Sequence, residues 1–124
     1  MDLPVERLSR MVVLVDTTVW ALVDRETVVA MVGATFDVVD HPIASPLVAG
    51  ALLVTTSTDT AALSGFRAAG IVGVISVIGR VPEANRSGAV TAVLQAGADY
   101  GLVKPEPAEV AAHVRAMTRR LRPD

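Results

Sequence analysis

Apolar residues along this chain fall into short runs that are separated by polar turns, with glycine or proline at many of the boundaries. Runs of this length that are rich in valine, isoleucine and leucine favour buried β-strands. The predicted strands are Met11–Val15, Phe36–Asp40, Ala51–Thr55, Ile71–Ile78 and Leu102–Val103. The fourth is the clearest, because mostly β-branched residues lie between two bounding glycines, Gly70 and Gly79.

Between these strands, apolar residues recur at the three- and four-residue spacing of amphipathic helices. The predicted helices are about Val19–Val32, Thr60–Ala69, one through Val90, Val93 and Leu94, and about Pro107–Arg122. His41-Pro42 and Ser45-Pro46 leave room for only one or two helical turns between the second and third strands. Strands that alternate with helices over short connections need right-handed crossovers, so the pattern predicts a parallel sheet.

The stretch from Gln95 to Pro105 combines a helix end, a turn, a short strand and an abrupt stop. Within it, Lys104 is a lone cation at the carboxyl end of the last predicted strand. Open α/β sheets bind their ligands at that end of the strands. Lys104 is therefore the first functional candidate, and Asp16, which follows the first strand, is the second.

Composition narrows the class of protein. A length of 124 residues fits one domain over 1–124, and 52% hydrophobic but only 3% aromatic residues indicate a core of small aliphatic side chains. A net charge of −2 and few aromatic residues argue against direct nucleic-acid binding. The absence of cysteine excludes disulfides and fits the cytoplasm, and neither a signal peptide nor a membrane segment is predicted.

Residues that could perform catalysis or bind metal are sparse. His41 and His113 are the only histidines, and neither lies in a ligand pattern or beside a candidate nucleophile. The hydroxyl residues at 55–60 lack the glycine spacing and lysine of a phosphate-binding loop, which favours an ordinary turn and helix cap. No enzyme activity, metal or cofactor is predicted.

One motif is more specific. Gly97-Ala98-Asp99-Tyr100-Gly101-Leu102-Val103-Lys104-Pro105, followed by Pro107-Ala108-Glu109, resembles the last strand and helix of the receiver domain of two-component response regulators. Met11–Asp16 resembles the first strand of that family, and the alternating strand–helix order fits nearly the whole chain. The resemblance implies a flavodoxin-like (βα)5 three-layer sandwich, a five-stranded parallel sheet and a role in cytoplasmic signal transduction.

The same resemblance implies a phosphorylation pocket that has lost its chemistry. Family members hold Mg²⁺ with an acidic pair after the first strand, and they carry a phosphoacceptor aspartate after the third strand and a lysine after the fifth. Here the vestigial pocket would consist of Asp16, Thr17, Thr55 and Lys104, with Lys104 paired to Asp16. A hydroxyl cannot form the acyl phosphate or anchor Mg²⁺ as a carboxylate does.

The switch positions of the family also differ. Its hydroxyl switch falls near Ile78 or Gly79, and its aromatic switch falls on Gly101, with Tyr100 one place away. We therefore expect a pseudo-receiver that acts by contact, with homodimerisation through the last strand and helix. Arg115, Arg119 and Arg122 mark that face, although basic residues also favour a helix C-terminus. The resemblance further implies that the chain is the regulatory half of a longer protein with a DNA-binding output domain.

Two alternatives remain open. Val15-Asp16-Thr17-Thr18-Val19-Trp20 resembles the opening of PIN-domain ribonucleases, which need three or four acids around Mg²⁺. The candidate acids downstream are Asp59, Glu83 and Asp99. A flavodoxin-like sensor whose pocket binds a small molecule is the second alternative, because a fold does not fix a function.

Overall fold

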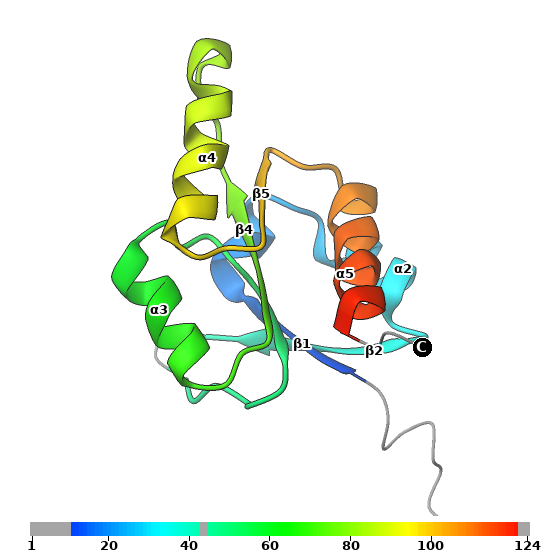
Figure 1. The fold of residues 1–124 in the computed structure, drawn as a ribbon. Coiled ribbons are helices and arrows are strands. Elements are labelled where there is room, and N and C mark those ends of the chain that lie inside the picture. The colour runs from blue at the N-terminus through cyan, green and yellow to red at the C-terminus, as the bar shows by residue number, and fades with distance from the viewer. Residues whose placement is uncertain (1–10, 43–44, 122–124) are drawn as a thin grey trace, which may run out of the picture.

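The computed structural model describes residues 11–42 and 45–121, and its centre is a five-stranded parallel sheet (Figure 1). The strands are β1 (Met11–Asp16), β2 (Phe36–His41), β3 (Leu52–Thr55), β4 (Gly73–Ile78) and β5 (Tyr100–Val103). They lie in the order β2-β1-β3-β4-β5, so the chain first extends the sheet to β2 and then returns past β1. This doubly wound arrangement is a flavodoxin-like α/β fold, as predicted.

Helices cover both faces of the sheet. The 3-10 helices are η1 (Thr17–Ala21) and η2 (Glu83–Asn85), and the α-helices are α2 (Arg25–Val32), α3 (Thr60–Ala68), α4 (Arg86–Ala96) and α5 (Pro107–Leu121). Helices α2 and α5 pack together on one face, and α3 and α4 pack on the other (Figure 1). The result is the expected three-layer sandwich.

Alternation along the strands divides the core into two clusters, one on each face. In β1, Val13 and Val15 belong to the cluster under α2 and α5, whereas Leu14 belongs to the cluster under α3 and α4. The central strand β3 is buried throughout, with Leu53 fully inaccessible. Strands buried on both faces explain why the sequence shows continuous apolar runs.

The predicted helix over Val19–Val32 is wrong, because the structure divides it into η1 and α2. Asp24 stands between the two segments as the N-cap of α2, and its carboxylate accepts the backbone N–H of Thr27 at 3.0 Å. The hydroxyl of Thr27 donates to the same carboxylate, and this bond, followed by the backbone one, lowers the pKa of Asp24. Because the carboxylate satisfies an N–H at the start of a helix, a new helix begins here and the earlier one ends.

The expected helical turns between β2 and β3 are also absent from the described part of that connection, which comprises Pro42 and residues 45–51. Prolines at 42 and 46 deprive this segment of two backbone donors, which disfavours a helix. The segment is held instead by turns, with Ala51 N–H bonded to Val48 O at 3.2 Å and Gly50 N–H to Gly70 O at 2.8 Å.

Other boundaries differ from the predictions by a few residues, and α4 begins at Arg86, directly after η2. Gly70 and Gly97, which follow helices, have φ values of 96° and 125°, which non-glycine residues rarely adopt.

Among the described residues, no helix has the length and apolar character needed to cross a membrane.

Candidate functional site

The buried polar side chains of the described residues gather at the carboxyl edge of the sheet. They are Asp16, His41, Thr55 and Ser76, each at most 7% exposed. In the parallel register, Asp16 lies beside His41, and Thr55 lies beside Ser76. Val15 lies beside Val54, so the residues that follow them, Asp16 and Thr55, are also neighbours. The four side chains therefore form one row across β2, β1, β3 and β4, which we call the polar row.

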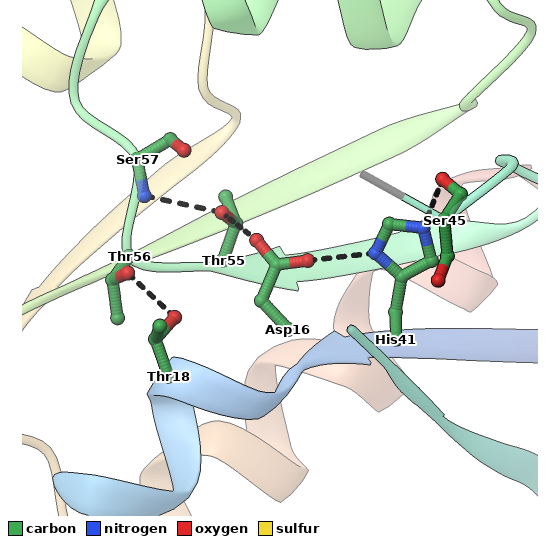
Figure 2. Close-up of polar contacts among 7 residues, drawn as sticks. All are labelled: Asp16, Thr18, His41, Ser45, Thr55, Thr56 and Ser57. Atoms are coloured by element: carbon green, nitrogen blue, oxygen red, sulfur yellow. Dashed lines mark hydrogen bonds and ion pairs between the residues drawn. The ribbon is translucent and has the colours of Figure 1, made fainter. Parts of the chain in front are cut away.

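Asp16 is the centre of the polar row, and both of its carboxylate oxygens are occupied (Figure 2). Oδ1 lies 2.9 Å from His41 Nδ1, and Oδ2 accepts the hydroxyl of Thr55. On the far side of the imidazole, His41 Nε2 lies 2.9 Å from the carbonyl oxygen of Ser45. Asp16 is thus joined to β2, to β3 and to the connection between them.

Hydroxyl groups of the polar row also fix the loop between β3 and α3. Ser57 N–H donates to Thr55 Oγ1 at 3.1 Å, and Ser76 Oγ donates to Ser57 O at 2.7 Å. Next to them, the hydroxyls of Thr18 and Thr56 lie 2.8 Å apart and join the segment after β1 to this loop (Figure 2). The two loops that flank Asp16 are thereby tied to the sheet and to each other.

Lys104 does not form the expected ion pair with Asp16, whose salt-bridge partner is His41. Its side chain is exposed and forms no salt bridge within residues 11–42 and 45–121. Its φ of 42° is the one positive value of a non-glycine residue in those ranges, and its N–H bonds to Ile78 O at 2.8 Å. Thr17 is likewise exposed, so only Asp16 and Thr55 of the predicted pocket come together.

The predicted switch positions are occupied by packing residues. Ile78 joins the core under α3 and α4, and a Cβ at Gly79 would meet the side chain of Leu22 at 3.7 Å. A Cβ at Gly101 would overlap Val93 of α4 and lie 3.5 Å from Val90 Cα. No space is therefore left for an aromatic side chain between β5 and α4.

Tyr100 points to the opposite face from Gly101 and packs against α5. Its ring meets His113 edge-on at a centroid separation of 4.6 Å, and Arg120 lies 6.0 Å from the ring. The hydrogen bond from Arg120 to the phenol raises the pKa of the guanidinium above its usual value. Tyr100 is therefore fixed in position by α5.

The arginines predicted to mark a partner face do not share one surface role. Arg115 donates to Met31 O at 2.9 Å and so connects α5 to α2. Arg119 is exposed near the end of α5, and Arg122 lies outside the described residues. Of the three, Arg119 alone is both described and without a bond to a neighbouring helix.

A further polar cluster, formed by Trp20, Arg25 and Asp40, lies beside the polar row on the other sheet face. Asp40 accepts Trp20 Nε1–H at 2.9 Å and pairs with Arg25 at 3.1 Å. The hydrogen bond from Arg25 is the main cause that lowers the pKa of Asp40, against a smaller rise from burial. This cluster fixes η1 and α2 against the end of β2.

The acids that a PIN-type nuclease would use are dispersed. Asp59 caps α3, and Asp99 pairs with Arg67 at 2.6 Å before β5, at the opposite edge of the parallel sheet from Asp16. Over the two described ranges, no three side chains of histidine, aspartate or glutamate come together as potential metal ligands. The polar row contains one acid and one imidazole.

Sequence reasoning missed His41 and Ser76. His41 was judged against metal and triad patterns, yet its position at the end of the second strand would have placed it beside Asp16 in a parallel register. Ser76 was missed because the hydroxyl residue of the receiver-type switch was expected at position 78 or 79. The strand register instead places Ser76 beside both Thr55 and Gly101.

No known protein-family model matches the chain, and no curated protein matches it significantly.

Proposed function

We propose that this chain is an atypical receiver-like signalling domain of the cytoplasm that acts through protein–protein contact and without phosphorylation. The observation that supports this most is the state of Asp16. Both of its oxygens are occupied by groups of the chain itself, and the residue beside it at the end of β3 is Thr55. A carboxylate whose oxygens are both occupied by hydrogen bonds in this way is a poor nucleophile and a poor ligand for Mg²⁺.

The packing around β5 further supports the proposal. Receiver-type switching needs an aromatic residue that moves between β5 and α4, but Val90 and Val93 fill that space against Gly101. Tyr100 is held on the other face by His113 and Arg120. Because this domain has neither a mobile aromatic side chain nor a free carboxylate, we propose that it acts through contacts made by its surface.

A phosphoryl analogue tests the chemistry directly. Amide spectra of the full chain with beryllofluoride and Mg²⁺ are expected to match spectra without them at residues 16, 55, 57 and 104. A phosphorylatable receiver domain measured in parallel provides the positive control. A Mg²⁺-dependent shift centred on Asp16 and Thr55, or an acyl phosphate detected by mass spectrometry after acetyl phosphate treatment, would contradict the proposal.

For the contact surface we propose the side of the domain formed by α4, β5 and α5, with a second copy as partner. β5 is an edge strand of the sheet, and Leu94 of α4 is 44% exposed. Leu94 follows Val90 by one helical turn, and Val90 contacts Gly101 of β5, so Leu94 lies on the β5 side of α4. An exposed leucine beside an edge strand is a suitable anchor for an interface.

The Leu94→Arg variant is expected to weaken self-association about tenfold or more, because it places a charge at the centre of this surface. Leu22→Arg is the matched control, since Leu22 is 43% exposed at the end of η1 and does not belong to α4, β5 or α5. Sedimentation velocity over a concentration range measures both. A wild-type chain that stays monomeric, or equal effects of the two variants, would refute the dimer.

A further inference from the structure

A hollow opens at the amino edge of the sheet, at the opposite end of the strands from the polar row. It is lined by Val72, Asp99, Met117 and Arg120, and its volume is about 110 Å³. Val72 and Asp99 directly precede β4 and β5, while Met117 and Arg120 lie in the last two turns of α5. We call this site the amino-edge hollow, because it lies where the two strands begin and the helix ends.

Asp99 brings a carboxylate to the hollow with one oxygen unused. Its Oδ2 accepts Val74 N–H at 2.8 Å and pairs with Arg67 Nη2 at 2.6 Å. No group of the described residues donates a hydrogen bond to Oδ1. Because the two bonds to Oδ2 fix the orientation of the carboxylate, Oδ1 is a preorganised acceptor for a ligand that carries its own donor.

Arg120 brings a guanidinium to the same hollow without an acidic partner. Its Nη1 lies 3.4 Å from the hydroxyl of Tyr100, and its Cζ lies 6.0 Å from the centre of that ring. Within residues 11–42 and 45–121, no aspartate or glutamate forms a salt bridge with it. Tyr100 thus positions the guanidinium, and the remaining N–H groups can bind a carboxylate through two parallel hydrogen bonds.

The charges around the hollow favour a ligand with two charged groups of opposite sign. Asp99 and Arg120 line one hollow but form no ion pair with each other. Since Arg67 already compensates Asp99, two guanidinium groups and one carboxylate meet at the site, which favours an anionic group beside Arg120. Oδ1 of Asp99 favours a cationic donor, so a ligand that carries both groups satisfies both sides.

The remaining lining of the hollow is apolar. Val72 is 39% exposed, and Met117 is buried. A Cβ at Gly73 would collide with the methyl group of Met117, so this side chain lies directly on the start of β4, and methionine adapts its shape to what it contacts. The volume is far below the ~300–1,000 Å³ of pockets for drug-sized ligands. The apolar part therefore suits a small aliphatic group.

From these observations we infer that the amino-edge hollow binds a free α-amino acid with a small aliphatic side chain. The carboxylate of the ligand pairs with Arg120, its ammonium donates to Asp99 Oδ1, and its side chain packs on Val72 and Met117. The end of a peptide satisfies the site less well, because it carries only one of the two charged groups. The inference goes beyond the proposed contact function, since the site is complete within one copy of the chain.

Amide spectra of the full chain, titrated with L-valine at neutral pH and constant ionic strength, test the site. Saturable shifts are expected at Val72, Asp99 and Arg120, with a dissociation constant on the order of 1 mM for so small a ligand. Amides of Asp16 and Thr55 in the polar row are expected to stay unchanged. Isovalerate, which lacks the ammonium, and isobutylamine, which lacks the carboxylate, are each expected to bind about tenfold more weakly or worse.

Three variants test the assigned contacts. Arg120→Gln is expected to weaken L-valine binding about tenfold, because a neutral amide cannot pair with the carboxylate. Arg119→Gln is the matched control, since Arg119 is exposed at the preceding position of α5 and does not line the hollow; its effect is expected to stay below about twofold. Val72→Glu removes part of the apolar lining and repels the carboxylate, so it is also expected to weaken binding. Asp99 is kept in all three because its Oδ2 bonds fix the start of β4.

Three results would overturn the amino-acid site. They are the absence of a saturable shift at about ten times the expected dissociation constant, binding of isovalerate or isobutylamine as tight as that of L-valine, and equal losses in Arg120→Gln and Arg119→Gln. Each can be obtained whether or not the chain dimerises or responds to beryllofluoride. The amino-acid site and the proposed signalling function can therefore fail separately.

Discussion

The His41→Leu variant is expected to lose about 1–3 kcal/mol of unfolding free energy, because it leaves the buried carboxylate of Asp16 without one of its two hydrogen-bond partners. Asp16 is 7% exposed, so water cannot easily take the place of the imidazole. Urea unfolding monitored by fluorescence measures the loss, and Trp20 is a convenient reporter because it is the only tryptophan in the chain.

The Asp16→Asn/His41→Leu double variant provides the critical comparison. It contains no buried charge, so it is expected to recover much of the stability that His41→Leu loses. His113→Leu is the control for removing a histidine, and it is expected to cost about 1 kcal/mol or less because His113 is half-buried on α5. A double variant less stable than His41→Leu would show that the cost of His41→Leu does not come from the carboxylate that it leaves without a partner.

The second large effect is expected at Gly101, where alanine should reduce the unfolding free energy by about 1–3 kcal/mol and a tyrosine by more. The added Cβ would overlap Val93 and approach the backbone of α4 at Val90 Cα, 3.5 Å away. Because α4 must move outward to relieve the overlap, amide shifts along α4 are expected to accompany the loss. Thermal and urea unfolding measure the stability change.

Gly65→Ala is the matched control for that substitution. Gly65 lies inside α3 with open space where its Cβ would be, so alanine is expected to raise the unfolding free energy by up to about 1 kcal/mol. If Gly101→Ala were as stable as wild type, α4 would not be packed tightly on β5. An aromatic switch would then have room at this position, which would contradict the proposed mode of action.

The sequence predicted the fold well because its strands are buried on both faces. Continuous apolar runs such as Ile71–Ile78 differ clearly from the helical spacing of Val110, Val114 and Met117. The two wrong predictions concern polar positions. Asp24 ends one helix by capping the next, and the connection after His41 forms turns where a short helix was expected.

Less of the candidate site could be predicted. Asp16 and Thr55 were found because each ends a strand, and the structure joins them by a hydrogen bond. Lys104 was selected from a local motif, but a motif does not determine where a long, flexible side chain ends. The structure shows it exposed, while His41 is the residue that pairs with Asp16.

By itself, the sequence determined the alternation of strands and helices, the parallel sheet and the presence of an acid and a hydroxyl at its carboxyl edge. These features depend on local periodicity and on the ends of strands, which neighbouring residues define. Only the tertiary structure decided which side chains meet. His41 and Asp16 are 25 residues apart in the chain, and Thr55 is 39 residues from Asp16. The register between strands, set by packing on both faces of the sheet, brings them into one row, so an aspartate that looks isolated in the sequence becomes part of a buried hydrogen-bond network.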